Sequence, residues 1–259
     1  MLTVRVVKIG GNELDRPVWV AECAQALRRA GPVVVVHGGG HAVSTWSRRL
    51  GLPVEKRDGM RVTTPEIAEL VEMVLGGPIN RLLVSALRAA GLDAIGLSGV
   101  DGGLLTAEPL AGGELGEVGE VVAVRGSLLQ SLLLAGLTPV IAPVAPSVTV
   151  PIRPLNVNAD QAAAAIAAAI GAQELLFVSD VPGVAMDGVA QPTLAAAEIE
   201  PMIEAGVASG GMAAKLRAAG HALQAGVRAV RIGDLDMFEH ATAGTRLLTA
   251  PPPPVVQPA

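Results

Sequence analysis

The chain has 259 residues, 51% of them hydrophobic and 17% charged, which excludes a disordered or fibrous protein. A net charge of −5 gives no basic field for nucleic acid, and a single cysteine, Cys23, excludes an intrachain disulfide. The chain starts on a strand-like pattern without a signal peptide, and no apolar run reaches about 18 residues. We therefore expect a soluble, cytoplasmic protein with no membrane segment and no nucleic-acid partner.

Strand-like and helix-like patterns alternate along the chain. In chain order we predict a strand at Thr3–Ile9, a helix at Pro17–Ala30, a strand at Pro32–Val36, helices at His41–Leu50, Pro65–Leu75 and Ile79–Ala90, strands at Ala94–Leu97 and Val118–Val124, a helix at Ser127–Ala135, a strand at Pro139–Pro143, a helix at Ala159–Ile170, a strand at Glu174–Val178, a hairpin around Asp187-Gly188, a helix at Gly211–Ala225 and a strand at Val227–Ile232. This alternation predicts an α/β fold with a mostly parallel sheet and helices on both faces. Ligands of such sheets bind where the strands end.

No linker-like stretch divides the chain into separate domains. We expect a single domain over residues 1–248, with an N-terminal lobe of about 1–171 and a C-terminal lobe of about 172–248. The Pro-rich tail, 249–259, is expected to be disordered.

Two glycine-rich loops follow predicted strands. In the first, Lys8 precedes Gly10 and Gly11, whose N–H groups can approach a phosphate, although a tight turn with a solvated lysine would have the same sequence. In the second, the His37–Gly40 stretch leads into a helix, which makes an anion site at the helix N-terminus. His37 and His41 are four residues apart, but the glycines between them disfavour a helical metal pair, so we expect no metal site of the protein's own.

Three further segments carry polar side chains in predicted loops. Asn156, Asn158 and Asp160 precede the Ala-rich helix, and a helix cap requires only one such residue. The turn-rich loop Ser179–Val184 follows a strand and could hold a nucleotide. In Gly210–Lys215, glycines open a helix whose N-terminus and nearby lysine suit a phosphate.

Lysine is scarce, with 3 Lys against 16 Arg. Two of the three, Lys8 and Lys215, lie in glycine-rich motifs, which indicates a need for a compact ammonium rather than a planar guanidinium. Lys56 belongs to no such motif. Arg61 lies ahead of a predicted helix and suits a carboxylate, although a surface arginine would fit the same spacing.

Taken together and in order, these motifs resemble the amino acid kinase family, and within it the branch that acts on N-acetylglutamate. The matching stretches are KIGG at 8–11, VVHGGG at 35–40, DGMRVT at 58–63, EMVLGGPIN at 72–80, NVNADQAA at 156–163, SDVPGV at 179–184 and GGMAAK at 210–215. The resemblance implies a three-layer αβα sandwich with a mostly parallel central sheet. It also implies an enzyme of arginine biosynthesis that phosphorylates the side-chain carboxylate of N-acetyl-L-glutamate with ATP, the N-terminal lobe binding the acid and the C-terminal lobe ATP.

The resemblance also implies a role for each residue of these motifs. The catalytic residues would be Lys8, Lys215 and Asp160, with both lysines on the transferring phosphoryl group and Asp160 positioning both of them. The acid-binding residues would be Gly38, Gly39, Arg61, Asn156 and Asn158. The ATP-binding residues would be Gly10, Gly11, Ser179, Asp180, Val181, Pro182, Gly183, Val184, Val207, Ala208, Ser209, Gly210 and Met212. Mg²⁺ would arrive with ATP.

The chemistry of such a transfer agrees with these residues. A side-chain carboxylate with a pKa of about 4.3 is ionised at neutral pH and needs no general base. Phosphoryl transfer instead requires positioning and neutralisation of charge, which lysines, N–H groups and Mg²⁺ supply.

Other functions of the same fold stay open. A kinase for aminoadipate or glutamate linked to a carrier protein should present a basic docking surface, which the net charge disfavours. Carbamate, aspartate and uridylate kinases match less well over residues 58–80. A non-catalytic nucleotide or amino acid sensor is disfavoured by the joint presence of Lys8, Asp160 and Lys215.

The resemblance also bears on assembly. It implies that arginine-sensitive members are hexamers with an extra N-terminal helix. Here the first strand is predicted from Thr3, and Pro251–Pro254 are incompatible with a helix interior. We therefore expect a homodimer that arginine does not inhibit.

Overall fold

The structure, a computed structural model, describes residues 3–57, 59–110, 113–149 and 153–249. Apart from Thr249, the tail for which disorder was predicted lies outside these residues. Each of the seven predicted helices is present, with both ends within one residue of the prediction.

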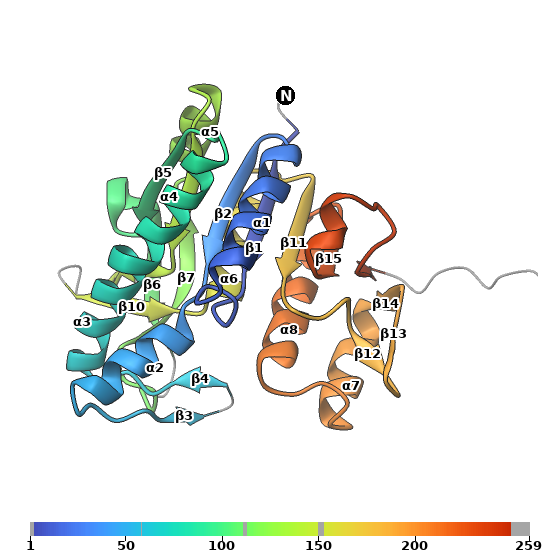
Figure 1. Ribbon diagram of the computed structural model, residues 1–259. Coiled ribbons are helices and arrows are strands. Elements are labelled where there is room, and N and C mark those ends of the chain that lie inside the picture. Colours follow the sequence, from blue (N-terminus) through green and yellow to red (C-terminus); the bar gives the residue numbers. More distant parts are fainter. Residues whose placement is uncertain (1–2, 58, 111–112, 150–152, 250–259) are drawn as a thin grey trace, which may run out of the picture.

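One eight-stranded sheet runs through the whole molecule (Figure 1). In spatial order its strands are β14 (Thr193–Ala195), β16 (Thr245–Leu248), β15 (Val230–Gly233), β11 (Glu174–Val178), β1 (Arg5–Ile9), β2 (Val33–His37), β8 (Thr138–Ala142) and β5 (Ala94–Ser98). Neighbouring strands are parallel except β15 and β16. The mostly parallel sheet is therefore confirmed, and it is continuous across residue 171.

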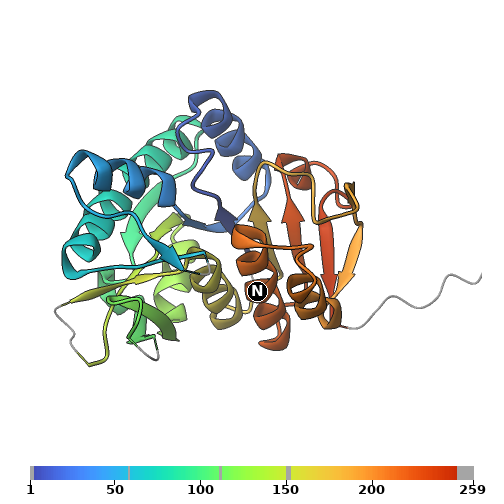
Figure 2. The ribbon, with the colours of Figure 1, turned by 90° about the horizontal axis from the view of Figure 1, so that it is seen from below.

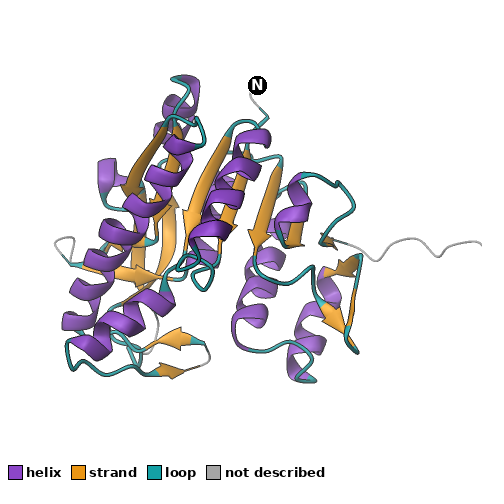
Figure 3. Ribbon diagram, in the orientation of Figure 1, coloured by secondary structure: helices purple, strands orange, loops and turns teal. Residues whose placement is uncertain are grey.

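Helices cover both faces of this sheet (Figures 1 and 3). The helices are α1 (Pro17–Arg29), α2 (Gly40–Arg49), α3 (Pro65–Val74), α4 (Asn80–Ala89), α5 (Gly126–Leu134), α6 (Ala159–Ala169), α7 (Ile199–Glu204) and α8 (Gly210–Gln224). Alternate side chains of β1 point to opposite faces: Val7 and Ile9 join the core under α1 and α4, whereas Val6 joins the core under α6 and α8. The three-layer αβα arrangement is confirmed.

Smaller sheets flank the main one. A four-stranded sheet contains, in spatial order, β6 (Leu105–Pro109), β7 (Val118–Val124), β10 (Pro154–Val157) and β9 (Val144–Pro146). Two hairpins pair β3 (Lys56–Arg57) with β4 (Met60–Arg61) and β12 (Ala185–Met186) with β13 (Val189–Ala190). The predicted hairpin is confirmed, because positive φ angles at Asp187 and Gly188 make its turn. Of the four-stranded sheet the sequence predicted only β7, since the other strands are short and interrupted by proline.

The segment Pro65–Ala89 is long and apolar enough to cross a membrane by length and composition, the one such segment in the described part of the chain. It comprises α3, a kink at Leu75–Ile79, where Gly77 has non-helical backbone angles (φ −95°, ψ −108°), and α4. Its helices pack on α2, α1 and β5 and bury the polar residue Asn80 within the protein. We interpret it as a pair of core helices.

Candidate active site

Three neighbouring strands, β2, β1 and β11, end at the same edge of the sheet, the lower edge in Figure 1. β1 is where the strand order turns, with β2 on one side and β11 on the other. A crevice forms outside the strand ends at such a point. Figure 2 looks onto this edge, with residues before about 171 (blue to olive) to the left and later residues (gold to red) to the right. Residues from all three strand ends line one cavity of about 530 Å³.

The two glycine-rich loops touch each other at this edge. The N–H of Gly38 donates to the carbonyl of Ile9 at 3.0 Å. A Cβ on Gly11 would lie 2.6 Å from the backbone nitrogen of Gly39, and a Cβ on Gly39 would collide with Leu75, so larger residues do not fit there.

This contact changes the acid-binding prediction for Gly38, because its N–H is already engaged inside the protein. The next two N–H groups, those of Gly39 and Gly40, belong to the N-cap and first residue of α2 and have no helical carbonyl to bond. Both residues line the cavity. The N–H groups that this loop leaves without a partner among the described residues are therefore those of Gly39 and Gly40, and an acid contact by Gly38 and Gly39 stays a prediction.

The N-termini of α6 and α8 also face this cavity, through Asn158 and Gly210. The side-chain oxygen of Asn158 accepts from the N–H groups of Asp160 (2.8 Å) and Gln161 (3.2 Å), so it caps α6. Its predicted contact with the acid stays a prediction. Three helix N-termini give the cavity a positive potential, which favours anions.

Lys8 and Asp160 form a buried ion pair in the cavity. Nζ of Lys8 lies 2.8 Å from Oδ1 of Asp160, and both residues are 6% exposed. Lys215 approaches from α8, and its Nζ lies 3.5 Å from the carbonyl of Gly211. Among the described residues Asp160 makes an ion pair with Lys8 and none with Lys215. Its ion pair is thus with Lys8, and the positioning of both ammoniums by Asp160 stays a prediction.

Electrostatics still couple Lys215 to these groups. Burial lowers the pKa of Lys215, and the charge of Lys8 lowers it further, while Asp160, Glu13 and Asp180 oppose the shift. An anionic phosphate placed between the two lysines would relieve both the burial and the repulsion. The charges in the cavity thus favour binding of an anion.

All three lysines of the chain line this cavity, including Lys56 from β3. The sequence analysis had no role for Lys56, although the scarcity of lysine was a signal for it. Glu13 was missed altogether: it lines the cavity, is 3% exposed, and its Oε2 has no hydrogen-bond partner among the described residues. No motif marked it, since a carboxylate after a glycine loop is usually solvated.

Arg61 and Asn156 lie where an acid could bind. Nη2 of Arg61 donates to the carbonyl of Gly40 (2.9 Å) and to Oγ of Ser44 (2.6 Å). Its Nη1 is buried and has no partner in the described structure. The amide nitrogen of Asn156 donates to Oγ1 of Thr63 at 3.1 Å, and both Arg61 and Asn156 line the cavity. A guanidinium held in place with one unpartnered nitrogen suits a carboxylate, and the acid contacts of Arg61 and Asn156 stay predictions.

The residues predicted to bind ATP fall into two groups. Those that line the cavity are Gly10, Gly11, Ser179, Asp180 and Gly210. Those that lie outside it are Val181, Pro182, Gly183, Val184, Val207, Ala208, Ser209 and Met212. Val184 is 1% exposed and its N–H donates to Oγ1 of Thr245, so it acts in packing here. Nucleotide contacts from the second group stay a prediction.

Comparisons with known proteins agree with this fold. The model of the family described as "Amino acid kinase family" matches residues 3–234. The acetylglutamate kinase of Chloroflexus aurantiacus (strain J-10-fl) is 50% identical over 238 residues, which cover 91% of this chain and 93% of the relative. That of Geobacillus kaustophilus is 44% identical over 241 residues, which cover 92% and 93%.

Solved structures extend the comparison. A crystal structure from Streptococcus mutans UA159 has a TM-score of 0.86 at 27% identity, and the match covers 96% of this chain and 100% of that one. Carbamate kinase from Giardia lamblia bound to AMP-PNP has a TM-score of 0.71 at 14% identity, over 96% of this chain and 99% of that one, and it shows the fold alone. The sequence and fold therefore place this chain in the amino acid kinase family, a family of phosphotransferases.

Proposed function

We propose that this protein phosphorylates the side-chain carboxylate of N-acetyl-L-glutamate with ATP, giving N-acetylglutamyl 5-phosphate in arginine biosynthesis. Relatives named acetylglutamate kinase match it over more than nine-tenths of its length. The observation that carries the proposal is that Lys8, Lys215, Arg61 and two glycine loops line one cavity. These groups suit two anionic substrates that must be brought together.

The reaction needs no proton transfer at the nucleophile. A carboxylate oxygen forms a bond to the γ-phosphorus while the bond from that phosphorus to the β,γ-bridging oxygen breaks, which gives an acyl phosphate and ADP. Lys8 and Lys215 neutralise charge on the equatorial oxygens, and Asp160 fixes the ammonium of Lys8. A histidine base is not required.

The acid is held on the side of the cavity formed by the first 171 residues. The free Nη1 of Arg61 binds its α-carboxylate, Asn156 and Asn158 bind near its acetamide, and the N–H groups of Gly39 and Gly40 bind the carboxylate that reacts. ATP is held by residues 172–248, by the Gly10-Gly11 loop and by the Ser179–Val184 loop. This division into an acid lobe and an ATP lobe is part of the proposal.

Mg²⁺ is expected to arrive bound to the phosphates of ATP, where it adds further neutralisation of their charge. The carboxylates of Glu13 and Asp180 line the cavity, and oxygen ligands of this kind suit Mg²⁺. The unpartnered Oε2 of Glu13 supports a cation nearby when ATP is bound. We also propose a cytoplasmic homodimer without membrane or nucleic-acid partners.

A substrate panel tests the function. ADP release is measured with N-acetylglutamate, glutamate, aspartate, carbamate and UMP, and the acyl phosphate is trapped with hydroxylamine. We expect N-acetylglutamate to be the preferred acceptor. Faster turnover of another acceptor would overturn the assignment, and ATP binding without any turnover would indicate a sensor.

A further inference from the structure

Two buried polar side chains lie beneath the Gly38–Gly40 loop, and the proposed reaction does not use either. His37 ends β2, and Asn80 begins α4 after the kink at Leu75–Ile79. Both are 0% exposed and neither lines the cavity. Polar side chains buried this deeply are generally hydrogen-bonded, and their bonds hold the neighbouring groups in place.

Their contacts determine the tautomer of the imidazole. Nδ1 of His37 lies 2.9 Å from the carbonyl oxygen of Gly38, which can only accept, so Nδ1 carries the hydrogen. Nδ2 of Asn80 lies 3.2 Å from Nε2 of His37 and 2.9 Å from the carbonyl oxygen of Val140. The bond to Val140 orients the amide with its nitrogen toward His37, so Nε2 is the acceptor and the ring is neutral. Burial agrees, because it lowers the pKa of His37 to about 4, with the charge of Lys8 contributing and the bond to Gly38 opposing.

The imidazole thereby fixes the peptide between Gly38 and Gly39. The carbonyl of Gly38 is held by Nδ1–H of His37, and the N–H of Gly38 by the carbonyl of Ile9. Since the peptide is planar and trans, fixing its carbonyl oxygen also fixes the opposite direction of the Gly39 N–H. That N–H is one of the donors left for the acid.

Asn80 leaves its side-chain oxygen without a hydrogen bond among the described residues, while its side-chain nitrogen donates to His37 and Val140. Its Oδ1 is buried without a partner in the described structure and occupies the space that a Cβ on Gly96 would fill. The kink before Asn80, at Gly77 and Pro78, also puts Leu75 against Gly39. The sequence analysis used the EMVLGGPIN stretch, which contains this kink, for the family resemblance and gave none of its residues a role in the site.

We propose that His37 and Asn80 are positioning residues: Asn80 holds the imidazole in its neutral Nδ1–H form, and the imidazole aims the N–H of Gly39 at the acid. Neither side chain touches a substrate. The identity of that acid rests on the proposed function, whereas the tautomer and the hydrogen bonds do not.

The first test is spectroscopic and independent of activity. Long-range ¹H–¹⁵N correlation spectra of the ligand-free protein report the protonation of each imidazole nitrogen. We expect His37 to stay neutral with the hydrogen on Nδ1 down to about pH 5. The chain has four histidines, and the signal of His37 is the one lost in His37→Asn. A hydrogen on Nε2 at neutral pH would overturn the proposal.

The second test uses Asn80→Asp, which replaces the donor with an acceptor of equal size. Nε2 of His37 must then carry a hydrogen to bond the carboxylate. The imidazole therefore either becomes positively charged or gives up the hydrogen on Nδ1 that it donates to the carbonyl of Gly38. We expect KM for N-acetylglutamate to rise roughly tenfold or more, as for one lost hydrogen bond, with KM for ATP within twofold. His37→Leu should give the same separation of the two KM values. His37→Asn, which can still donate to Gly38, should recover part of the loss.

His41→Asn is the matched control, because His41 is exposed beside the same loop and outside the cavity. It should change neither KM. Equal changes in both KM values for Asn80→Asp, or none, would overturn the proposal while leaving the kinase assignment intact. If the wild-type protein failed to turn over N-acetylglutamate, the assignment would fail instead, and the spectra would still decide the tautomer.

Discussion

Lys8 and Lys215 hold their charges in different ways. Lys8 is paired with Asp160 at 2.8 Å, whereas Lys215 has one long contact with a carbonyl and a lowered pKa. Asp160 keeps Lys8 in place before substrates bind. In the proposed reaction Lys215 gains its partner when the phosphate of ATP arrives, so we expect its contribution in the bound and reacting states.

We predict that Lys8→Ala and Lys215→Ala each lower kcat by about 10²–10³-fold, more than they raise either KM. Lys215→Arg should also be poor, since a planar guanidinium does not replace a compact ammonium. Steady-state kinetics measure both. Arg217→Ala is the control, because Arg217 lies on the same helix but pairs with Glu200 outside the cavity. A near-normal kcat for either lysine variant would remove that lysine from the site.

Arg61→Ala should mainly raise KM for the acid and leave KM for ATP nearly unchanged. The reason is that Arg61 lines the cavity and, in the proposed reaction, makes a ground-state contact with the acid. Arg57→Ala, an exposed change in the same hairpin, should have no effect. A change confined to KM for ATP would place Arg61 in the nucleotide site.

Stability should fall as the pH drops through the range where His37 titrates. Its pKa is about 4 in the folded protein and about 6.5 in the unfolded chain. Between these values the unfolded chain takes up a proton and the folded protein does not, so the stability present above pH 6.5 is lost toward pH 4. The loss is on the order of 3 kcal/mol. Urea unfolding of the wild type and of His37→Asn across this pH range measures this loss. An equal dependence of the free energy of unfolding on pH in the two proteins would contradict the prediction.

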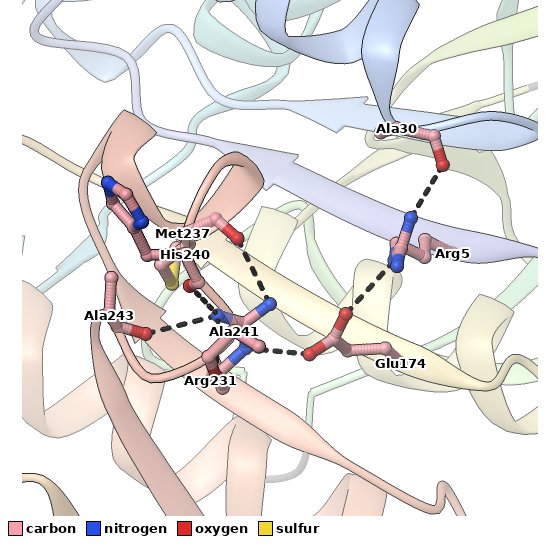
Figure 4. Close-up of polar contacts among 8 residues, drawn as sticks. All are labelled: Arg5, Ala30, Glu174, Arg231, Met237, His240, Ala241 and Ala243. Atoms are coloured by element: carbon pink, nitrogen blue, oxygen red, sulfur yellow. Dashed lines mark hydrogen bonds and ion pairs between the residues drawn. The ribbon is translucent and has the colours of Figure 1, made fainter.

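At the scale of elements, the opposite edge of the sheet holds β1, β11 and β15 together. Glu174 accepts from Nε of Arg5 at 3.1 Å and from Nε of Arg231 at 2.7 Å (Figure 4). Arg231 also donates to carbonyl oxygens of the segment after β15, among them those of Met237 (3.1 Å) and Ala243 (3.1 Å). One carboxylate on β11 thus links β1 with β15.

Glu174→Gln should lower the free energy of unfolding by about 2 kcal/mol, because two arginines lose a charged partner and Arg231 is largely buried. Both KM values should stay unchanged, since Glu174 begins β11 and the site follows its end. Urea unfolding and steady-state kinetics are the measurements. Arg88→Ala, which breaks the exposed pair with Asp93, should cost under about 1 kcal/mol. A change in KM without a change in stability would contradict this role.

At the scale of the whole molecule, the expected assembly is a homodimer that arginine does not inhibit. Sedimentation of the wild-type protein should give the mass of two chains, about twice 26.2 kDa. Rates measured with millimolar arginine should equal those without it. A hexamer whose activity falls with arginine would contradict both expectations.

The sequence by itself determined the alternation of helices and strands, and with it the αβα fold. It also placed Lys8 near the end of a strand, Gly39 and Ser179 in loops that follow strands, and Lys215 near the start of a helix. These features follow from local periodicity, glycines and caps, which act within a few residues. Because parallel strands end at one edge, their loops were bound to meet.

Only the tertiary structure decided which residues of those loops contact one another and which line the cavity. The pairing of Asp160 with Lys8 rather than Lys215, the entry of Lys56 and Glu13 into the cavity, and the engagement of the Gly38 N–H depend on distances between segments far apart in the chain. The contact between His37 and Asn80 joins residues 43 positions apart and depends on the kink before Asn80. Packing, not local propensity, sets such distances, because close-packed cores fix side chains by their neighbours in space.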